Sequence, residues 1–66
     1  MDKQTITVKE AAAYIGVSKD LVYQLVRERK VPHLRLSHRI LFRKEALHRW
    51  LTTQEVLSVQ QDNNNH

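Results

Sequence analysis

The sequence predicts a small, mostly helical α+β domain within its 66 residues. Apolar residues recur at helical spacing in two segments before Lys30 and in one after Arg43. Between Pro32 and Arg43 they alternate with polar residues, at the period of a β-strand. Gly16 and Pro32 separate these segments as turn residues do. A chain this short has room for about three helices and a hairpin, and none for a deep substrate cleft.

The first helix is expected over Val8–Ile15, after a short extended piece at residues 5–7. Thr7 and Glu10 have the Thr-x-x-Glu spacing of a capping box, in which each side chain accepts a hydrogen bond from the other residue's amide. Gly16 stands where a helix C-cap needs a left-handed residue, a conformation that costs glycine least. The helix should therefore end at a tight turn.

A second helix is expected to start after Ser18, whose hydroxyl can accept from amides near Leu21. It should end near Arg29 or Lys30, because Pro32 cannot continue a helix. A helix of about eight residues, a short turn with glycine and another helix match the spacing of a helix-turn-helix, whose second helix enters a DNA groove. The same spacing also occurs in helical proteins that bind no DNA.

The two faces of this second helix differ in chemistry. One is an apolar stripe that can dock on a core, made of Val22, Leu25 and Val26. The opposite face carries a cation, a carboxylate, a phenol, an amide and a guanidinium, from Lys19, Asp20, Tyr23, Gln24 and Arg27. Such a mixture suits the edges of bases and the phosphates beside them.

Two short alternating runs after Pro32 predict a β-hairpin around a three-residue polar loop, Ser37-His38-Arg39. In that register the inward side chains are Leu34, Leu36, Ile40 and Phe42, and the outward ones are His33, Arg35 and Leu41.

A third helix is expected over residues 44–51, where one apolar stripe contains Ala46, Leu47, Trp50 and Leu51. Trp50 is expected to be the largest part of the core rather than to stack on a nucleobase. The helix can continue through residues 52–59 with weak amphipathicity. Residues 1–60 are thus expected to form one domain, and residues 61–66 a disordered polar tail.

Positive charge is concentrated in one part of the chain. The net charge is +4, but eight basic and two acidic residues lie between Arg27 and Arg49, a segment charge of +6. The remainder has three basic and five acidic residues, a charge of −2. This one-sided distribution favours a polyanionic partner over a merely solvated surface.

Several other classes of function are disfavoured. The absence of cysteine excludes disulfides and thiolate zinc sites and fits a reducing cytoplasm. The four histidines are too widely spaced to suggest a metal site, and no cofactor is expected. No apolar run approaches the roughly 18 residues of a membrane span, and the N-terminus lacks a signal peptide, so no membrane partner is expected. No nucleophile–base pair, carboxylate pair or phosphate loop suggests an enzyme.

Several of these segments, in the same order, resemble the excisionase-type DNA-binding domain, a small winged-helix relative of the MerR-type head. The resemblance covers residues 5–51 of the chain. It is carried by residues 7–18 (TVKEAAAYIGVS), 22–27 (VYQLVR), 31–32 (VP), 35–39 (RLSHR) and 42–51 (FRKEALHRWL).

The resemblance implies a winged helix-turn-helix that binds double-stranded DNA, with the second helix in the major groove and the hairpin at the adjacent minor groove or backbone. By matching positions, the DNA-contacting residues would be Ser18, Lys19, Tyr23, Gln24 and Arg27 from the helix and His38 and Arg39 from the hairpin. Ordinary surface roles are the alternatives: Arg27 paired with Glu28, Tyr23 packed on the first helix, and the others solvated.

The resembled family contains phage and mobile-element excisionases, which bind and bend DNA to steer an integrase toward excision, and small transcriptional regulators. A MerR-type transcription factor normally carries a further domain, so the short tail here favours an excisionase. Such a factor would gain affinity from an integrase or from cooperative self-association on DNA, through Leu41 or residues 52–60. A transcriptional regulator is the alternative of the same fold, and a basic protein-interaction adaptor is an alternative of another class.

The chain departs from the resembled pattern at three positions. Arg29 and Ser37 stand where the family usually has glycine, and Arg43 stands where it often has proline. The first two departures predict a less tight exit from the second helix and a different turn type in the hairpin loop.

Overall fold

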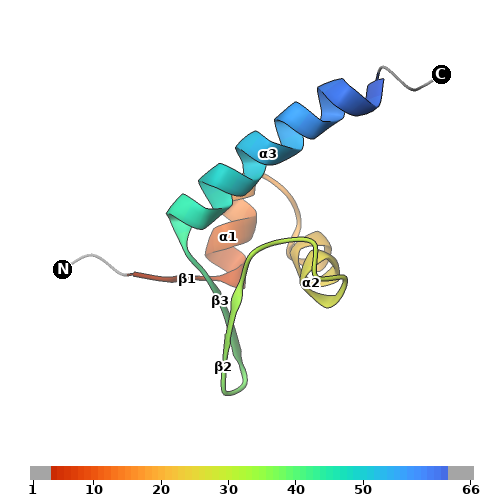
Figure 1. Cartoon of the computed structure of the whole chain (residues 1–66). Helices are drawn as coiled ribbons and strands as arrows, with labels where there is room; N and C mark the ends of the chain where they lie inside the picture. Colours follow the sequence, from red (N-terminus) through yellow and green to blue (C-terminus); the bar gives the residue numbers. More distant parts are fainter. Residues whose placement is uncertain (1–3, 63–66) are drawn as a thin grey trace.

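The computed structural model of the chain describes residues 4–62. Its elements follow in the order β1 (Ile6–Thr7), α1 (Val8–Ile15), α2 (Lys19–Arg27), β2 (Leu34–Leu36), β3 (Arg39–Phe42) and α3 (Lys44–Asp62). The strands form one antiparallel sheet in the order β1-β3-β2, and the β2–β3 hairpin extends away from α3 as a wing beside α2 (Figure 1). The arrangement confirms the predicted α+β fold of a winged helix-turn-helix.

The N-caps of α1 and α2 and the C-cap of α1 form as the sequence predicts. Thr7 Oγ1 accepts from the Glu10 amide at 3.2 Å, and Glu10 Oε1 accepts from the Thr7 amide at 2.9 Å, which completes the capping box. Gly16 ends α1 in the left-handed conformation, with a φ of 90°. Ser18 Oγ then caps α2 by accepting from the Leu21 amide at 3.2 Å. These local bonds set the direction in which α2 leaves α1.

α2 ends at Arg27, earlier than the predicted end at Arg29 or Lys30. Arg29 has a φ of 57°, which cannot continue a helix. Its amide donates to the Val26 carbonyl at 3.0 Å and the Lys30 amide donates to the Leu25 carbonyl at 2.9 Å, the two bonds of a Schellman motif. The prediction of a less tight exit is therefore wrong. The arginine adopts the conformation of the usual glycine, at a cost of about 1–2 kcal/mol.

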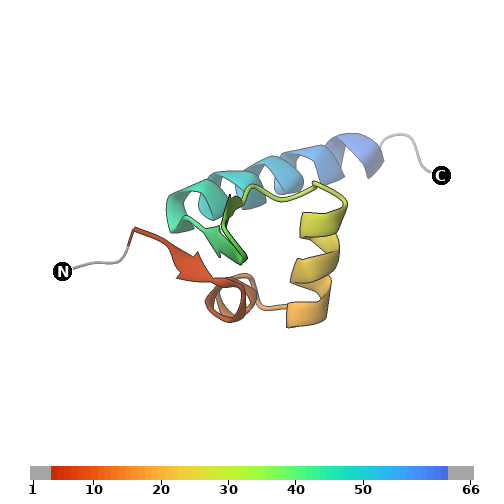
Figure 2. The ribbon, with the colours of Figure 1, turned by 90° about the horizontal axis from the view of Figure 1, so that it is seen from below.

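The core lies between α1, α2, the sheet and the first turns of α3. Its buried members are Phe42, Leu47, Val22, Ile6, Val8, Ala11, Ala12, Val26 and Val31. The prediction for Trp50 is confirmed only in part, because its side chain packs at the margin of this core. The indole Nε1 donates to the Lys30 carbonyl oxygen at 2.8 Å, so α3 is tied to the segment that follows α2 (Figure 2).

The wing is built on a two-residue turn, Ser37-His38, instead of the predicted three-residue loop. Its paired residues are Leu34 with Leu41, Arg35 with Ile40, and Leu36 with Arg39. A shift of one residue reverses the face of every side chain on the shifted strand. The prediction that Leu34 and Leu36 face the core is therefore wrong, and Leu36 is 56% exposed.

The other face of the wing is directed to the core. Ile40 and Phe42 lie on it, as the sequence predicts. Phe42 is fully buried and Ile40 is partly buried against the core. Arg35 pairs with Ile40 and so shares their face, although the sequence predicts it to be outward. Ser37 allows this register because it has a φ of 57°, the positive value that a two-residue hairpin turn requires at its first position. Like Arg29, it takes the conformation of the usual glycine.

α3 continues beyond residue 51 and runs to Asp62. Its second half projects past the other elements, and Val56, Leu57 and Val59 are exposed there (Figure 1). The predicted tail begins at residue 61, and its residues 63–66 lie outside the described part of the chain. Among the residues described, no helix combines the length and apolar character needed to cross a membrane.

The positive φ values at Gly16 and Ser37 give opposite predictions for stability. Gly16→Ala is expected to lower the free energy of unfolding by about 1–2 kcal/mol, because an L-residue is strained there. A Cβ at Gly16 meets nothing within 4 Å, so this loss would come from the backbone alone. Ser37→Gly is expected to raise the free energy by roughly 0.5–1 kcal/mol. Urea unfolding followed by circular dichroism measures both. A Gly16→Ala variant as stable as the wild type would contradict the left-handed C-cap.

Candidate nucleic-acid interface

The polar face of α2 is exposed as its sequence predicts. Val22 and Val26 are buried and fix the rotation of the helix about its axis. All five residues of the opposite face are exposed: Lys19, Asp20, Tyr23, Gln24 and Arg27. Asp20 lies in the first turn, where a carboxylate is stabilised by the helix dipole. The basic and amide side chains of α2 are therefore exposed to solvent.

A cleft of roughly 340 Å³ separates the N-terminal half of α2 from the wing; we call it the N-terminal cleft. Its lining consists of Lys19 and Tyr23 from α2, His38, Arg39, Ile40 and Leu41 from the wing, Thr7 from β1, and Val8 and Lys9 from the start of α1. Four of the predicted contact residues, Lys19, Tyr23, His38 and Arg39, thus surround one hollow. Tyr23 is 42% exposed, so its ring lines this cleft rather than the core.

A second cleft, the C-terminal cleft, lies at the other end of α2. It is lined by Val26, Arg27, Arg29, Val31, Pro32, His33 and Arg35. Arg27 is thus placed here, apart from the other predicted contact residues. Arg29 and Arg35 are absent from the predicted set, because each joins Arg27 only through the Schellman turn and the register of the wing. The one sequence signal at Arg29 is an arginine at a position where the resembled family has glycine.

Ser18 and Gln24 line neither cleft, and both already have hydrogen-bond partners. Ser18 Oγ is the acceptor that caps α2, although its own O–H remains a donor. Gln24 Nε2 donates to Glu28 Oε2 at 3.2 Å. To form two hydrogen bonds to a base, the Gln24 side-chain amide would have to break its hydrogen bond to Glu28.

Two ion pairs occur within the described part of the chain, Lys30–Glu28 at 3.3 Å and Arg43–Glu45 at 3.1 Å. Glu28 therefore pairs with Lys30 and not with Arg27, which was the surface alternative for that arginine. The hydrogen bond from Gln24, followed by the contact with Lys30, lowers the pKa of Glu28. Both pairs are exposed, and exposed pairs contribute little to stability. The pair with Lys30 leaves Glu28 without an ion pair to Arg27 or Arg29.

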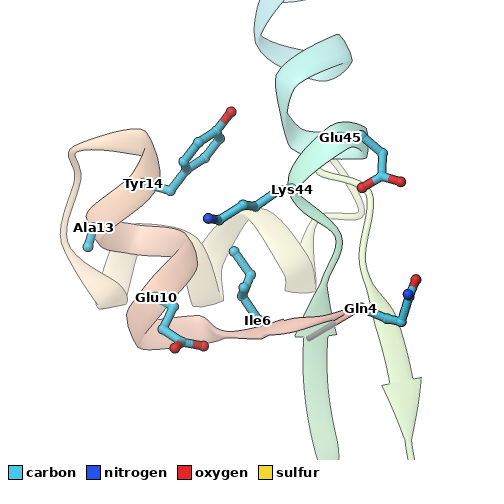
Figure 3. A pocket seen from close by; sticks show the side chains of 7 residues that line it. All are labelled: Gln4, Ile6, Glu10, Ala13, Tyr14, Lys44 and Glu45. Carbon is cyan, nitrogen blue, oxygen red and sulfur yellow. The ribbon is translucent and has the colours of Figure 1, made fainter. Parts of the chain in front are cut away.

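A hollow larger than either cleft lies between α1 and the start of α3 (Figure 3). It is lined by Gln4, Ile6, Glu10, Ala13, Tyr14, Lys44 and Glu45, and Lys44 extends across it toward α1. Two carboxylates and one ammonium give it no excess of positive charge. Within the described residues, no three histidine or acidic side chains come together as metal ligands. The basic clefts beside α2 are therefore the candidate site.

Comparison with known proteins identifies one match. The model of a helix-turn-helix domain family matches residues 5–55 of the chain, a segment that contains β1 to β3, the first half of α3 and both clefts. The searches of curated proteins and of solved structures return no match.

The bond between Gln24 and Glu28 gives a prediction for titration. Gln24→Ala is expected to raise the pKa of Glu28 toward its ordinary value, because the largest cause of the lowered pKa is removed. A pH titration followed by NMR at the Glu28 side-chain carbons measures it. Tyr23→Phe, an exposed neighbour that does not bond Glu28, serves as the control. An unchanged titration of Glu28 in Gln24→Ala would mean that the amide is free in solution.

Proposed function

Because the chain belongs to a helix-turn-helix domain family, we propose that it binds double-stranded DNA sequence-specifically, as an accessory factor of the excisionase type. It bends the DNA of an attachment site and so promotes excision by an integrase. This function needs no catalytic residue, cofactor, metal or membrane, and it places the protein with DNA in the cytoplasm.

One observation carries the proposal: Lys19 and Tyr23 of α2 and His38 and Arg39 of the wing border a single cleft. One duplex can therefore meet the helix and the wing together. The major groove, about 12 Å wide, admits an α-helix. With α2 in this groove, the wing lies at the adjacent minor groove or its backbone. Two elements on one duplex fix both its position and its orientation.

The contact residues divide into two groups by chemistry. Lys19 and the hydroxyls of Ser18 and Tyr23 suit phosphate oxygens, which position the protein without reading sequence. Gln24 suits adenine, whose N6 and N7 match the two polar groups of a side-chain amide.

The remaining contacts come from the wing and from the end of α2. Arg39, beside His38 near the wing tip, suits a narrow minor groove, where the negative potential is deepest. Arg27 forms no ion pair among the residues described, so its guanidinium can bind a phosphate of the DNA backbone.

The excisionase role is supported by the order of the sequence motifs and by the family, a DNA-binding family that includes excisionase-like proteins. The integrase or a second copy on DNA is proposed to bind the second half of α3. Val56, Leu57 and Val59 are exposed there, whereas Leu41 is partly buried and lines the N-terminal cleft. A small transcriptional regulator would use the same DNA contacts.

A salt titration of binding to a duplex tests the proposed function. A protein that contacts about 4–6 phosphates should lose affinity with a log–log slope of roughly −4 to −5. Absence of binding at low salt, on duplexes from a randomised library, would favour a protein-interaction adaptor instead. Circular-permutation bending and an excision assay with the cognate integrase then separate an excisionase from a transcriptional regulator.

Arg39 and Gln24 are predicted to act differently. Arg39→Ala should weaken binding to all sequences and make the salt slope about one unit less steep, because one positive charge is lost from between the phosphates that flank the minor groove. Gln24→Ala should mainly relax discrimination, by about 1–3 kcal/mol at one base pair. Fluorescence anisotropy on a selected site and on single-base variants distinguishes the two effects. Wild-type affinity of both variants on the selected site would count against these roles.

A further inference from the structure

We propose that Arg27, Arg29 and Arg35 of the C-terminal cleft form a second phosphate-binding site, which holds the DNA backbone on the far side of the major groove from Lys19. The inference rests on the proposed function and adds two residues, Arg29 and Arg35, to its contact surface. The two sites would grip the two strands that border one groove.

No carboxylate lines the C-terminal cleft, and the acidic side chain that attracts Arg27, that of Glu28, is bonded to other partners. The lining of the cleft contains three arginines and one histidine. Glu28, the acidic residue nearest in sequence, accepts from Gln24 at 3.2 Å and from Lys30 at 3.3 Å. No ion pair within the described residues involves the three arginines. Three unpaired guanidiniums around one hollow repel one another, and a bound phosphate would remove that repulsion.

The backbone holds these arginines in place. The Trp50 indole donates to the Lys30 carbonyl at 2.8 Å, and Val31 is buried in the core. On the other side of the cleft, the pairing of Arg35 with Ile40 sets Arg35 on the wing face that is directed to the core. Anchored residues therefore flank the arginines on both elements. A guanidinium on a fixed backbone loses less conformational freedom when it binds a phosphate with two hydrogen bonds.

Arg29 itself is in a strained conformation. Its φ of 57° is the value that glycine adopts most easily at this point of a Schellman motif. An arginine in this conformation lowers the stability of the fold but places its guanidinium beside the cleft. Backbone conformations of this strained kind cluster at functional sites.

The length of α2 matches a grip on both strands. Lys19 and Arg27 are eight residues apart, a separation of about 12 Å along a helix axis. The major groove is also about 12 Å wide. With the axis of α2 inclined across this groove, the N-terminal cleft would lie near one phosphate backbone and the C-terminal cleft near the other.

Salt titrations of single variants test the site on a mixed-sequence duplex. Arg35→Ala removes one guanidinium, and Arg29→Gly removes another while it keeps the left-handed turn. Each should make the log–log slope about one unit less steep, and the double variant about two. Lys44→Ala, which removes one charge from the hollow between α1 and α3, is the control and should leave the slope within experimental error. Circular dichroism and urea unfolding confirm that each variant is folded.

Arg39→Ala, measured in parallel, separates the two ideas. If the wild type does not bind the duplex, the proposed function fails. A second outcome is that the wild type binds, Arg39→Ala makes the salt slope less steep, and Arg29→Gly and Arg35→Ala leave the slope unchanged. In that case only the second phosphate-binding site is wrong. Saturable binding of inorganic phosphate at millimolar concentration, with unchanged slopes on the duplex, would assign the cleft to a small anion and overturn the proposal as well.

Neutral methylphosphonates placed singly in a selected duplex locate the contact. The phosphate whose neutralisation weakens the wild type should have no effect in Arg35→Ala, and it should lie across the major groove from the phosphate that depends on Lys19. Both phosphates on the same side of the groove would overturn the two-strand grip. Arg35→Lys should restore part of the lost affinity, because it restores the charge without the two-pronged geometry.

Discussion

The register of the wing is the constraint on which the rest of the surface depends. Phe42 is fully buried and pairs with Ile6 of β1, so the end of β3 is fixed in the core. From that anchor, a two-residue turn sets Arg35 opposite Ile40 and places His38 and Arg39 beside α2. A slip of one residue would exchange the faces of β2 and turn Arg35 away from α2. The burial of Phe42 therefore determines which basic side chains of the wing lie beside α2.

Local sequence signals predict the starts of α1 and α2 and the end of α1, because each of these cap bonds joins residues a few positions apart. The capping box of Thr7 and Glu10, the Gly16 turn and the Ser18 cap all occur where the sequence predicts them. The register of the wing could not be predicted in this way. It depends on a positive φ at Ser37, which serine seldom adopts and which tertiary packing imposes. The end of α2 was missed for the same reason, since Arg29 takes the conformation of a glycine.

The candidate site was predictable to the extent that it lies on one helical face. The exposure of Lys19, Tyr23 and Gln24 follows from the apolar stripe on the other side of α2. The convergence of Lys19 and Tyr23 with His38 and Arg39 was expected from the resemblance and agrees with the lining of the N-terminal cleft. Arg35 could not be found without the strand pairing, and the bond that occupies Gln24 depends on a side-chain conformation that no sequence pattern encodes.

α3 has two halves with different support. The first half contributes Leu47 to the core and is tied down by the indole of Trp50, whereas the second half carries exposed valines and a leucine on a cylinder that touches little else. Isolated helices of fewer than about 12–15 residues are marginal in water. The distal turns should therefore fray and exchange their amide protons quickly while the wing and α2 stay folded. The protein thus joins a packed domain, which contains both clefts, to a helix end with few tertiary contacts of its own.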